Sequence, residues 1–341
     1  MNVLVIRFSS IGDVALTIPA VKGALAQNSD LHITFLSKSF FAPLFQNTER
    51  LHFEGIDLKQ YQGLKGLIRL ASEIKNKYEH FDVILDLHDS LRSKIIRSIF
   101  LLNRSKVKII NKGRAEKRLL TRRNNKKLHP LKHHTERYAD VFRSSGIQIN
   151  IPTNSDQLIH LSIENSTIAD EYLLSLGGKI YIGIAPFTTS ELKEWPKNKI
   201  SALIHEILDT NPALSILIFG SRDDISKIQD FLDINPARVF SAIGIKGGLS
   251  IELSIIKRLK LMIAMDSGNM HLATMLGTKV KAVFGPTHPF LGFAPFLQEQ
   301  NVIQLEHLEC RPCTVFGNTT CWRKDHACME NLKISVTDLE R

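Results

Sequence analysis

The sequence lacks any apolar run long enough to cross a bilayer, which as a helix takes roughly 20 residues. The apolar run at residues 3–6 is too short for a signal peptide, and no positive charge precedes it. We therefore expect a soluble, cytoplasmic protein. The composition, with 43% hydrophobic residues, is that of a globular chain.

Glycine-rich phosphate loops are also lacking. Neither G-x-x-x-x-G-K-[ST] nor G-x-G-x-x-G occurs anywhere in the chain. These motifs let the backbone approach the phosphates of nucleotides in P-loop enzymes and in dinucleotide-binding folds. Their absence removes the main support for a kinase, a nucleoside triphosphatase or a nicotinamide-dependent enzyme.

Acidic residues are outnumbered, and the formal net charge is +10. The excess is local, because residues 103–137 hold thirteen Lys or Arg against two Glu. Such a patch attracts phosphates of any kind, including those of anionic lipids and sugar phosphates. Tyr138 is the one aromatic residue near it, which argues against base stacking. A non-catalytic anion- or RNA-binding protein is therefore the less favoured hypothesis, and we expect no nucleic-acid partner.

The length of 341 residues is typical of two domains. Apolar strand-like runs alternate with helical patterns, which predicts α/β domains with mostly parallel sheets. Residues 151–166 have no clear period and contain Pro152. We place the boundary near residue 155, with doubly wound domains at residues 1–155 and 156–341 and a cleft between them.

The most informative stretch is residues 261–289, which reads strand, loop, helix, strand. Asp266, Ser267 and Gly268 follow the first strand, and His271 lies on the first turn of the helix. The carboxyl ends of strands in open α/β sheets are where ligands bind. The alternative is that Asp266 or Ser267 only caps the helix. A second polar loop at residues 285–289 shifts the balance toward a binding site.

Two further loops follow predicted strands. Asp13 closes the small, hydroxyl-rich loop 9–13, where it either accepts a proton or simply caps the next helix. Pro19 predicts a short turn near Asp13 and a longer helix beyond. The later loop carries Thr188, Thr189 and then Lys193, and hydroxyl and ammonium groups suit a diphosphate. The alternative there is a solvated loop with an exposed lysine.

The cysteines fall within nineteen residues, as Cys310, Cys313, Cys321 and Cys328. The spacing C-x2-C-x7-C-x6-C could supply a tetrahedral structural zinc site. The second pair lacks the short spacing of a zinc ribbon, so reduced, partly buried thiols are the other interpretation. A disulfide is disfavoured in a reducing compartment.

Residues 7–14 (RFSSIGDV) and 17–20 (TIPA) resemble the N-terminal signature of family 9 glycosyltransferases, the lipopolysaccharide heptosyltransferases. Residues 266–273 (DSGNMHLA), 276–278 and 284–287 resemble the C-terminal signature of that family. Residues 134–138, the segment 188–196 and the cysteine cluster are further similarities. Asn269 departs from the pattern, since the family more often has proline or an aliphatic residue there.

The resemblance implies a GT-B fold, in which two Rossmann-like doubly wound domains face each other across a cleft. The first domain would hold the acceptor and the second a nucleotide sugar. It implies inverting transfer without a cofactor and without a metal at the reaction centre, with Asp13 as general base. It assigns the donor to Thr188, Thr189, Lys193, Asp266, Ser267, Gly268 and His271. It assigns the acceptor to Ser10, Gly12, Lys112, Arg114, Lys117 and Arg118.

These inferences predict an enzyme that transfers heptose from ADP-heptose to the inner core of lipopolysaccharide. The acceptor would be a lipid-linked anionic saccharide, reached by peripheral contact with the inner face of the inner membrane. Two alternatives keep the fold: a glycosyltransferase that uses another nucleotide sugar, and a nucleotide-sugar epimerase that needs no acceptor.

Overall fold

The computed structural model describes residues 1–78, 80–101, 105–156 and 158–340. The sequence also predicts a helix at residues 91–102, and its last residue lies outside this range, as do the first two residues of the basic stretch 103–137. The chain divides into two compact units. Unit 1 comprises Met1–Lys112, His134–Thr153 and Gln157–His160, and unit 2 comprises Gly113–His133, Asn154–Asp156 and Leu161–Arg341. Each unit is described by itself.

Unit 1 is built on a parallel sheet whose strands, among the described residues, lie in the order β3-β2-β1-β4-β5. Strand β1 lies in the middle and pairs with β2 on one side and β4 on the other. The strands are β1 (Asn2–Ile6), β2 (His32–Lys38), β3 (Leu51–Ile56), β4 (Val83–Asp86) and β5 (Lys106–Ile109).

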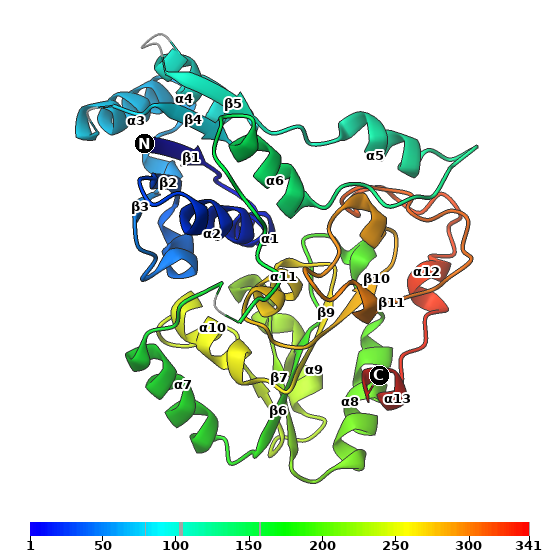
Figure 1. The fold of residues 1–341 in the computed structure, drawn as a ribbon. Coiled ribbons are helices and arrows are strands. Elements are labelled where there is room, and N and C mark those ends of the chain that lie inside the picture. Colours follow the sequence, from blue (N-terminus) through cyan, green and yellow to red (C-terminus); the bar gives the residue numbers. More distant parts are fainter. Residues whose placement is uncertain (79, 102–104, 157, 341) are drawn as a thin grey trace. The chain divides into compact units, whose positions relative to one another are not determined.

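Helices flank this sheet (Figure 1). They are α1 (Ile11–Ala15), α2 (Ile18–Gln27), α3 (Gly63–Lys77), α4 (Leu91–Leu101) and α6 (His134–Arg143). Helices α3 and α4 pack together, and their apolar faces share a core with alternate strand residues such as Leu4 and Ile6. Helix α2 packs beside α6. Pro19 lies in the first turn of α2, after the short α1, as its fixed φ predicts.

Unit 2 also has a parallel sheet, with the order β11-β10-β9-β6-β7-β8 among the described residues. The strands are β6 (Ile180–Ala185), β7 (Leu214–Ile218), β8 (Val239–Ser241), β9 (Leu261–Met265), β10 (Val280–Phe284) and β11 (Val302–Gln304). Every residue of β7, β9 and β10 is buried. This burial explains why these strands are mostly apolar rather than alternating, with Ser215 in β7 and Lys281 in β10 as the exceptions.

Unit 2 has helices of its own, and several of them pack against its sheet (Figure 1). They are α5 (Arg114–Thr121), α7 (Ile163–Ser175), α8 (Lys197–Thr210), α9 (Gln229–Leu232), α10 (Leu249–Arg258), α11 (Gly268–Met275), α12 (Ala327–Glu330) and α13 (Val336–Glu340). Helix α8 shares a core with β6, β7 and β9. Helices α7 and α10 pack against each other.

The predicted fold class, two doubly wound α/β domains, is therefore confirmed for each unit. The sequence analysis did not predict β3, β8, β11, α5, α7, α10, α12 or α13. Helix α7 lies partly within residues 151–166, which showed no clear period. Its N-cap, Ser162, accepts a hydrogen bond from the backbone of Asn165 at 3.1 Å.

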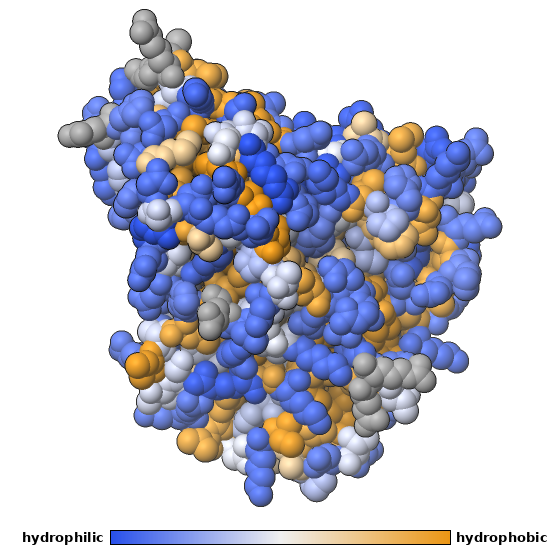
Figure 2. Space-filling model, viewed as in Figure 1, coloured by the Kyte–Doolittle hydropathy of each residue, from blue (hydrophilic) through white to orange (hydrophobic). Residues whose placement is uncertain are grey.

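The surface in Figure 2 is mixed, with hydrophobic residues scattered among hydrophilic ones. Single exposed apolar side chains such as Leu174 and Ile163 are ordinary for a globular protein. Every helix of the described residues is too short or too polar to cross a membrane.

The basic segment 113–133 belongs by its contacts to unit 2. The backbone amide of Leu131 donates to Phe290 at 2.9 Å, and the ammonium of Lys126 donates to the carbonyls of Cys310 and Pro312, both at 2.7 Å. The boundary near residue 155 would assign this segment to the first domain. Contacts between residues so distant in sequence leave no mark on local periodicity.

Gly23 in α2 yields a stability prediction. A Cβ there would lie 3.2 Å from the carbonyl carbon of Asn150 and closer still to its oxygen. Gly→Ala in a helix ordinarily gains up to about 1 kcal/mol, but here we expect a loss of about 1–3 kcal/mol from overpacking. Urea unfolding of Gly23→Ala, with the exposed Gln27→Ala in the same helix as control, measures it. A gain in stability would contradict the predicted contact with Asn150.

Candidate functional site

Each sheet has one point where the strand order reverses, and polar loops gather there. In unit 2 the reversal lies between β6 and β9, and in unit 1 between β1 and β4. The chain leaves neighbouring strands in opposite directions at such a point, so a crevice opens outside their carboxyl ends. The loops after these four strands carry Lys193, Asp266, Asp13 and His88.

In unit 2 the ammonium of Lys193 contacts the loop that carries Asp266. It donates to the main-chain carbonyl of Asp266 at 2.6 Å and lies 3.4 Å from its Oδ2. The hydroxyl of Thr287, which follows β10, donates to the same Oδ2 at 2.8 Å. The ends of three strands, β6, β9 and β10, are thus joined through one carboxylate. Lys193 is only 8% exposed, so its ammonium is held in a fixed place.

The start of α11 lies beside this cluster. Ser267 is the N-cap residue, yet its hydroxyl makes no capping bond, and within the described residues this buried oxygen has no hydrogen-bond partner. Gly268 is the first residue of the helix, and His271 is buried one turn further on. The first amide groups of a helix lack intrahelical acceptors and favour an anion. Ser267 therefore offers a hydroxyl donor where the helix favours negative charge.

The loop after β6 is held by its own hydroxyl. Thr188 donates from Oγ1 to the carbonyl of Ser190 at 2.7 Å and accepts from the amide of Ser190 at 3.0 Å. Its own amide donates to Glu194 at 2.8 Å, whose carboxyl pKa is raised by burial. Thr189 is exposed. The Thr188 hydroxyl thus shapes the turn that leads to Lys193, the last residue of the short 3-10 helix Glu191–Lys193.

In unit 1 the carboxylate of Asp13 is fixed by three donors on one oxygen. Its Oδ2 lies 2.7 Å from the guanidinium of Arg7 and accepts from the amide and hydroxyl of Ser10 at 3.1 and 3.0 Å. Ser10 and Asp13 form a capping box at the start of α1. Gly12 is buried beside them. Asp13 therefore bonds the start of α1, and its carboxylate is rigid and ion-paired rather than mobile.

Arg7 is the buried partner in this pair. Its side chain is 6% exposed, it donates to the carbonyl of Leu87 at 2.7 Å, and it lies 5.8 Å from the ring centroid of Tyr138. Burial opposes its charge, but Tyr138 and Asp13 outweigh that effect, so the pKa of Arg7 is raised. For the phenol of Tyr138, burial itself raises the pKa. Removing Asp13 would leave a buried, unbalanced positive charge.

The end of β4 adds residues that the sequence analysis did not single out. Asp86 is fully buried, pairs with Arg97, and accepts from the amides of His88 and Asp89 at 2.9 and 2.8 Å. This turn delivers His88, whose Nδ1 lies 3.4 Å from the amide of Phe8. Burial, together with the charge of Arg7, lowers the pKa of His88 to about 3. Its position after a buried strand was the signal that could have identified it.

The basic residues expected at the acceptor divide between the units. Lys112 belongs to unit 1, where its ammonium lies 3.5 Å from the carbonyl of Asp89. Arg114, Lys117 and Arg118 lie on α5 in unit 2. Lys117 is buried with its ammonium 4.3 Å from the ring centroid of Phe293, while Arg114 and Arg118 are exposed.

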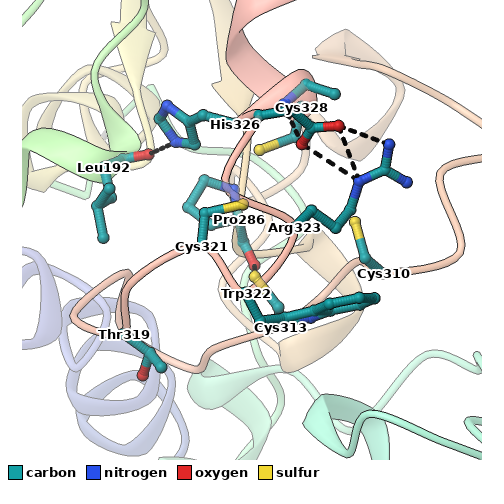
Figure 3. A pocket seen from close by; sticks show the side chains of 12 residues that line it. Leu192, Pro286, Cys310, Cys313, Thr319, Cys321, Trp322, Arg323, His326 and Cys328 are labelled. Carbon is teal, nitrogen blue, oxygen red and sulfur yellow. Dashed lines mark hydrogen bonds and ion pairs between the residues drawn. The ribbon is translucent and has the colours of Figure 1, made fainter.

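The four cysteines line one small cavity in unit 2 (Figure 3). Its volume is about 10 Å³, room for a single water. No disulfide joins the thiols, and the described residues contain no group of three or more His, Cys, Asp or Glu side chains arranged to hold a metal ion. Burial raises the pKa values of Cys310 and Cys313, and that of Cys328 to about 12. Thiolates rather than thiols bind zinc, and the described residues show no group arranged to hold a metal ion, so the prediction of structural zinc is not confirmed.

His88 makes stability depend on pH. Its folded pKa of about 3 lies below the ordinary 6.5, so below pH 6.5 the unfolded chain binds a proton that folded His88 does not. The free energy of unfolding therefore falls as pH drops from 6.5 toward 3, by at most about 1.4 kcal/mol per pH unit from this group. We expect His88→Gln to flatten the slope in urea titrations between pH 6.5 and 4, with His32→Gln, at an exposed histidine of the same unit, as control. An unchanged slope in His88→Gln would contradict the lowered pKa.

Comparison with known proteins identifies the family. The model described as Glycosyltransferase family 9 (heptosyltransferase) matches residues 67–321. Lipooligosaccharide heptosyltransferase 2 of Campylobacter jejuni is 31% identical over 171 residues, which are 47% of this chain and 50% of that protein. The chain thus spans about half the length of this curated relative and of its counterpart from a second Campylobacter jejuni strain.

Two solved structures share the fold. A family 9 glycosyl transferase from Veillonella parvula has a TM-score of 0.70 at 21% identity, over 89% of this chain and 86% of that one. The ADP-heptose lipopolysaccharide heptosyltransferase II of Escherichia coli has a TM-score of 0.68 at 19% identity, over 91% and 92%. Since the family model matches well over half of the sequence, the chain belongs to glycosyltransferase family 9.

Proposed function

We propose that this protein is an inverting glycosyltransferase that transfers heptose from ADP-heptose to the inner core of lipopolysaccharide. The observation that carries the proposal is the cluster of Lys193, Asp266 and Thr287 beside the N-terminus of α11 in unit 2. A nucleotide sugar leaves as a nucleoside diphosphate, and that cluster places an ammonium and a helix N-terminus together. The choice of ADP-heptose follows the name of the Escherichia coli relative.

The donor would be held by unit 2. Lys193 would offset the charge that develops on the diphosphate as its bond to the sugar breaks. The amides at the start of α11 and the hydroxyl of Ser267 would donate to phosphate or sugar oxygens. His271 lies one turn along the same helix, and Thr188 and Thr189 lie on the loop that ends at Lys193. When no donor is bound, Asp266 would hold the ammonium of Lys193 in place, because its carboxylate accepts from both Lys193 and Thr287.

Asp13 would act as the general base. A hydroxyl of the acceptor attacks the anomeric carbon as the bond from that carbon to the diphosphate breaks, and its proton passes to the Asp13 carboxylate. Attack on the face opposite the leaving group inverts the configuration. Arg7 and Ser10 hold this carboxylate in one orientation, which favours transfer along a single path.

The acceptor would be the phosphorylated, carboxylated saccharide of lipopolysaccharide, a lipid-linked molecule. Ser10 and Gly12 would approach its attacking sugar, and Lys112, Arg114, Lys117 and Arg118 would meet its negative charges. The protein would then work in the cytoplasm, in peripheral contact with the inner face of the inner membrane. Basic surface residues are attracted to such a surface by about 1 kcal/mol each.

Replacing Asp13 tests the chemical step. Asp13→Asn keeps the size of the side chain but removes the base, so we expect kcat to fall by about 10²–10⁴-fold with donor affinity unchanged. Turnover of ADP-heptose with a lipopolysaccharide inner-core acceptor measures kcat, and calorimetric titration measures affinity. Asp30→Asn, at an exposed carboxylate of the same unit, is the control. Near-normal turnover in Asp13→Asn would remove Asp13 from the role of base.

Replacing Lys193 tests the donor site. A ligand that binds only the folded protein raises its stability, so we expect ADP and ADP-heptose to raise the melting temperature. If Lys193→Ala weakens binding about tenfold, the stabilisation at a fixed, saturating concentration falls by about 1.4 kcal/mol. Lys197→Ala, at an exposed lysine paired with Asp230, is the control. A larger shift with another nucleotide sugar would overturn ADP-heptose as donor.

A further inference from the structure

Gly317 lies directly against the side chain of Lys193. It is buried, and its φ of +77° belongs to the left-handed region. A Cβ at this position would overlap the Cγ of Lys193 and come within 2.7 Å of its Cδ and 3.2 Å of its Cε. Because Gly317 has no side chain, the space next to it is open, and the aliphatic part of the Lys193 side chain runs through that space.

Gly317 is fixed to the same loop by a hydrogen bond. The hydroxyl of Ser190 donates to the carbonyl of Gly317. Ser190 itself is held by Thr188. Ser190 thus ties the carbonyl of Gly317 to the loop that carries Lys193.

The residues around Gly317, which we call the cysteine segment (310–328), are anchored at the other site loops as well. Arg311 is 4% exposed and donates to the carbonyls of Phe284 and Thr287, both at 3.0 Å, and to that of Gly285. The amide of Cys313 donates to Pro286 at 3.0 Å. Near the end of the segment, His326 bonds the carbonyl of Leu192 at 2.8 Å (Figure 3). One segment thus holds the loop after β10 and the loop that carries Lys193.

We propose that Gly317 is a positioning residue of the donor site, which keeps the ammonium of Lys193 at the place where the donor diphosphate binds. This inference rests on the proposed function, because it takes Lys193 as the diphosphate ligand. The long side chain of a lysine is flexible, and ordering it costs conformational entropy on binding. A stem confined beforehand between Gly317 and the lysine loop avoids much of that cost. The role needs a glycine for two reasons, the positive φ and the missing Cβ.

The structure offers a matched control for the backbone effect. Gly177 in the same unit has a φ of +73°, and a Cβ there would meet nothing within 4 Å. Gly177→Ala and Gly317→Ala therefore introduce similar backbone strain, but only the second pushes on Lys193. A difference between the two variants reports the contact with the lysine rather than the conformation of the glycine.

Calorimetric titration with ADP, GDP, UDP and CDP tests the inference, using the diphosphate that binds wild type most tightly. We expect Gly317→Ala to weaken its binding on the order of tenfold, and Gly177→Ala by less than about twofold. In a Lys193→Ala background, where the stem is gone, Gly317→Ala should cause no further loss. A merely structural defect would persist in that background. Ser190→Ala, which releases the carbonyl of Gly317, should give a smaller loss that also depends on Lys193.

The outcomes separate this inference from the proposed function. If Lys193→Ala weakens binding while Gly317→Ala binds as Gly177→Ala does, Gly317 has no positioning role and the donor site stands. If Gly317→Ala does not fold, Ser190→Ala decides, and unchanged affinity in that variant overturns the inference. If Lys193→Ala binds like wild type, or none of the four diphosphates binds wild type, the proposed donor site fails and the positioning role fails with it.

Discussion

The interaction on which the proposed donor site depends is the bonding of one buried ammonium, that of Lys193, to the loop that carries Asp266. Lys193 comes from the end of β6 and Asp266 from the end of β9, and these strands pair at the reversal of the sheet. A buried charge is tolerated only when it is paired and hydrogen-bonded. The carbonyl and carboxylate of Asp266, with Thr287 as a second donor to that carboxylate, meet this condition. A bound diphosphate would add negative charge without requiring the lysine to move.

Unit 1 also pairs a buried cation with a carboxylate, but there the carboxylate is clearly the more exposed of the two. There the buried member of the pair is the cation Arg7 at the end of β1, and the more exposed member is the carboxylate of Asp13. In unit 2 lysine and carboxylate are both nearly buried, and the hydroxyl of Ser267 remains without a partner among the described residues. The first arrangement presents a fixed carboxylate, as a base requires. The second presents positive charge and donors, as an anionic leaving group requires.

The sequence was sufficient where local signals and strand ends coincide. The strand, loop and helix around Asp266 and His271 were predicted nearly to the residue, because β9 and β10 are buried apolar runs flanked by polar turns. The split helix before and after Pro19 was also predicted. His88 was overlooked, because its lowered pKa comes from Arg7 and from burial, which only the pairing of β1 with β4 creates. The basic segment 113–133 belongs to unit 2 because it contacts residues 290–322. Contacts between residues so far apart in the sequence cannot be predicted from a local pattern.

The cysteine segment is important to the loops of unit 2, although the clustering of its cysteines suggested a metal site. Four cysteines within nineteen residues suggested a metal, yet the segment is fastened by main-chain carbonyls, by the buried guanidinium of Arg311 and by His326. Its thiols surround a cavity of about 10 Å³. Burial raises the pKa values of Cys310, Cys313 and Cys328, so these thiols pack as small apolar groups. Thiols fill such a corner without requiring hydrogen-bond partners. The polar groups of the segment therefore remain available to hold the two loops that carry Lys193 and Thr287.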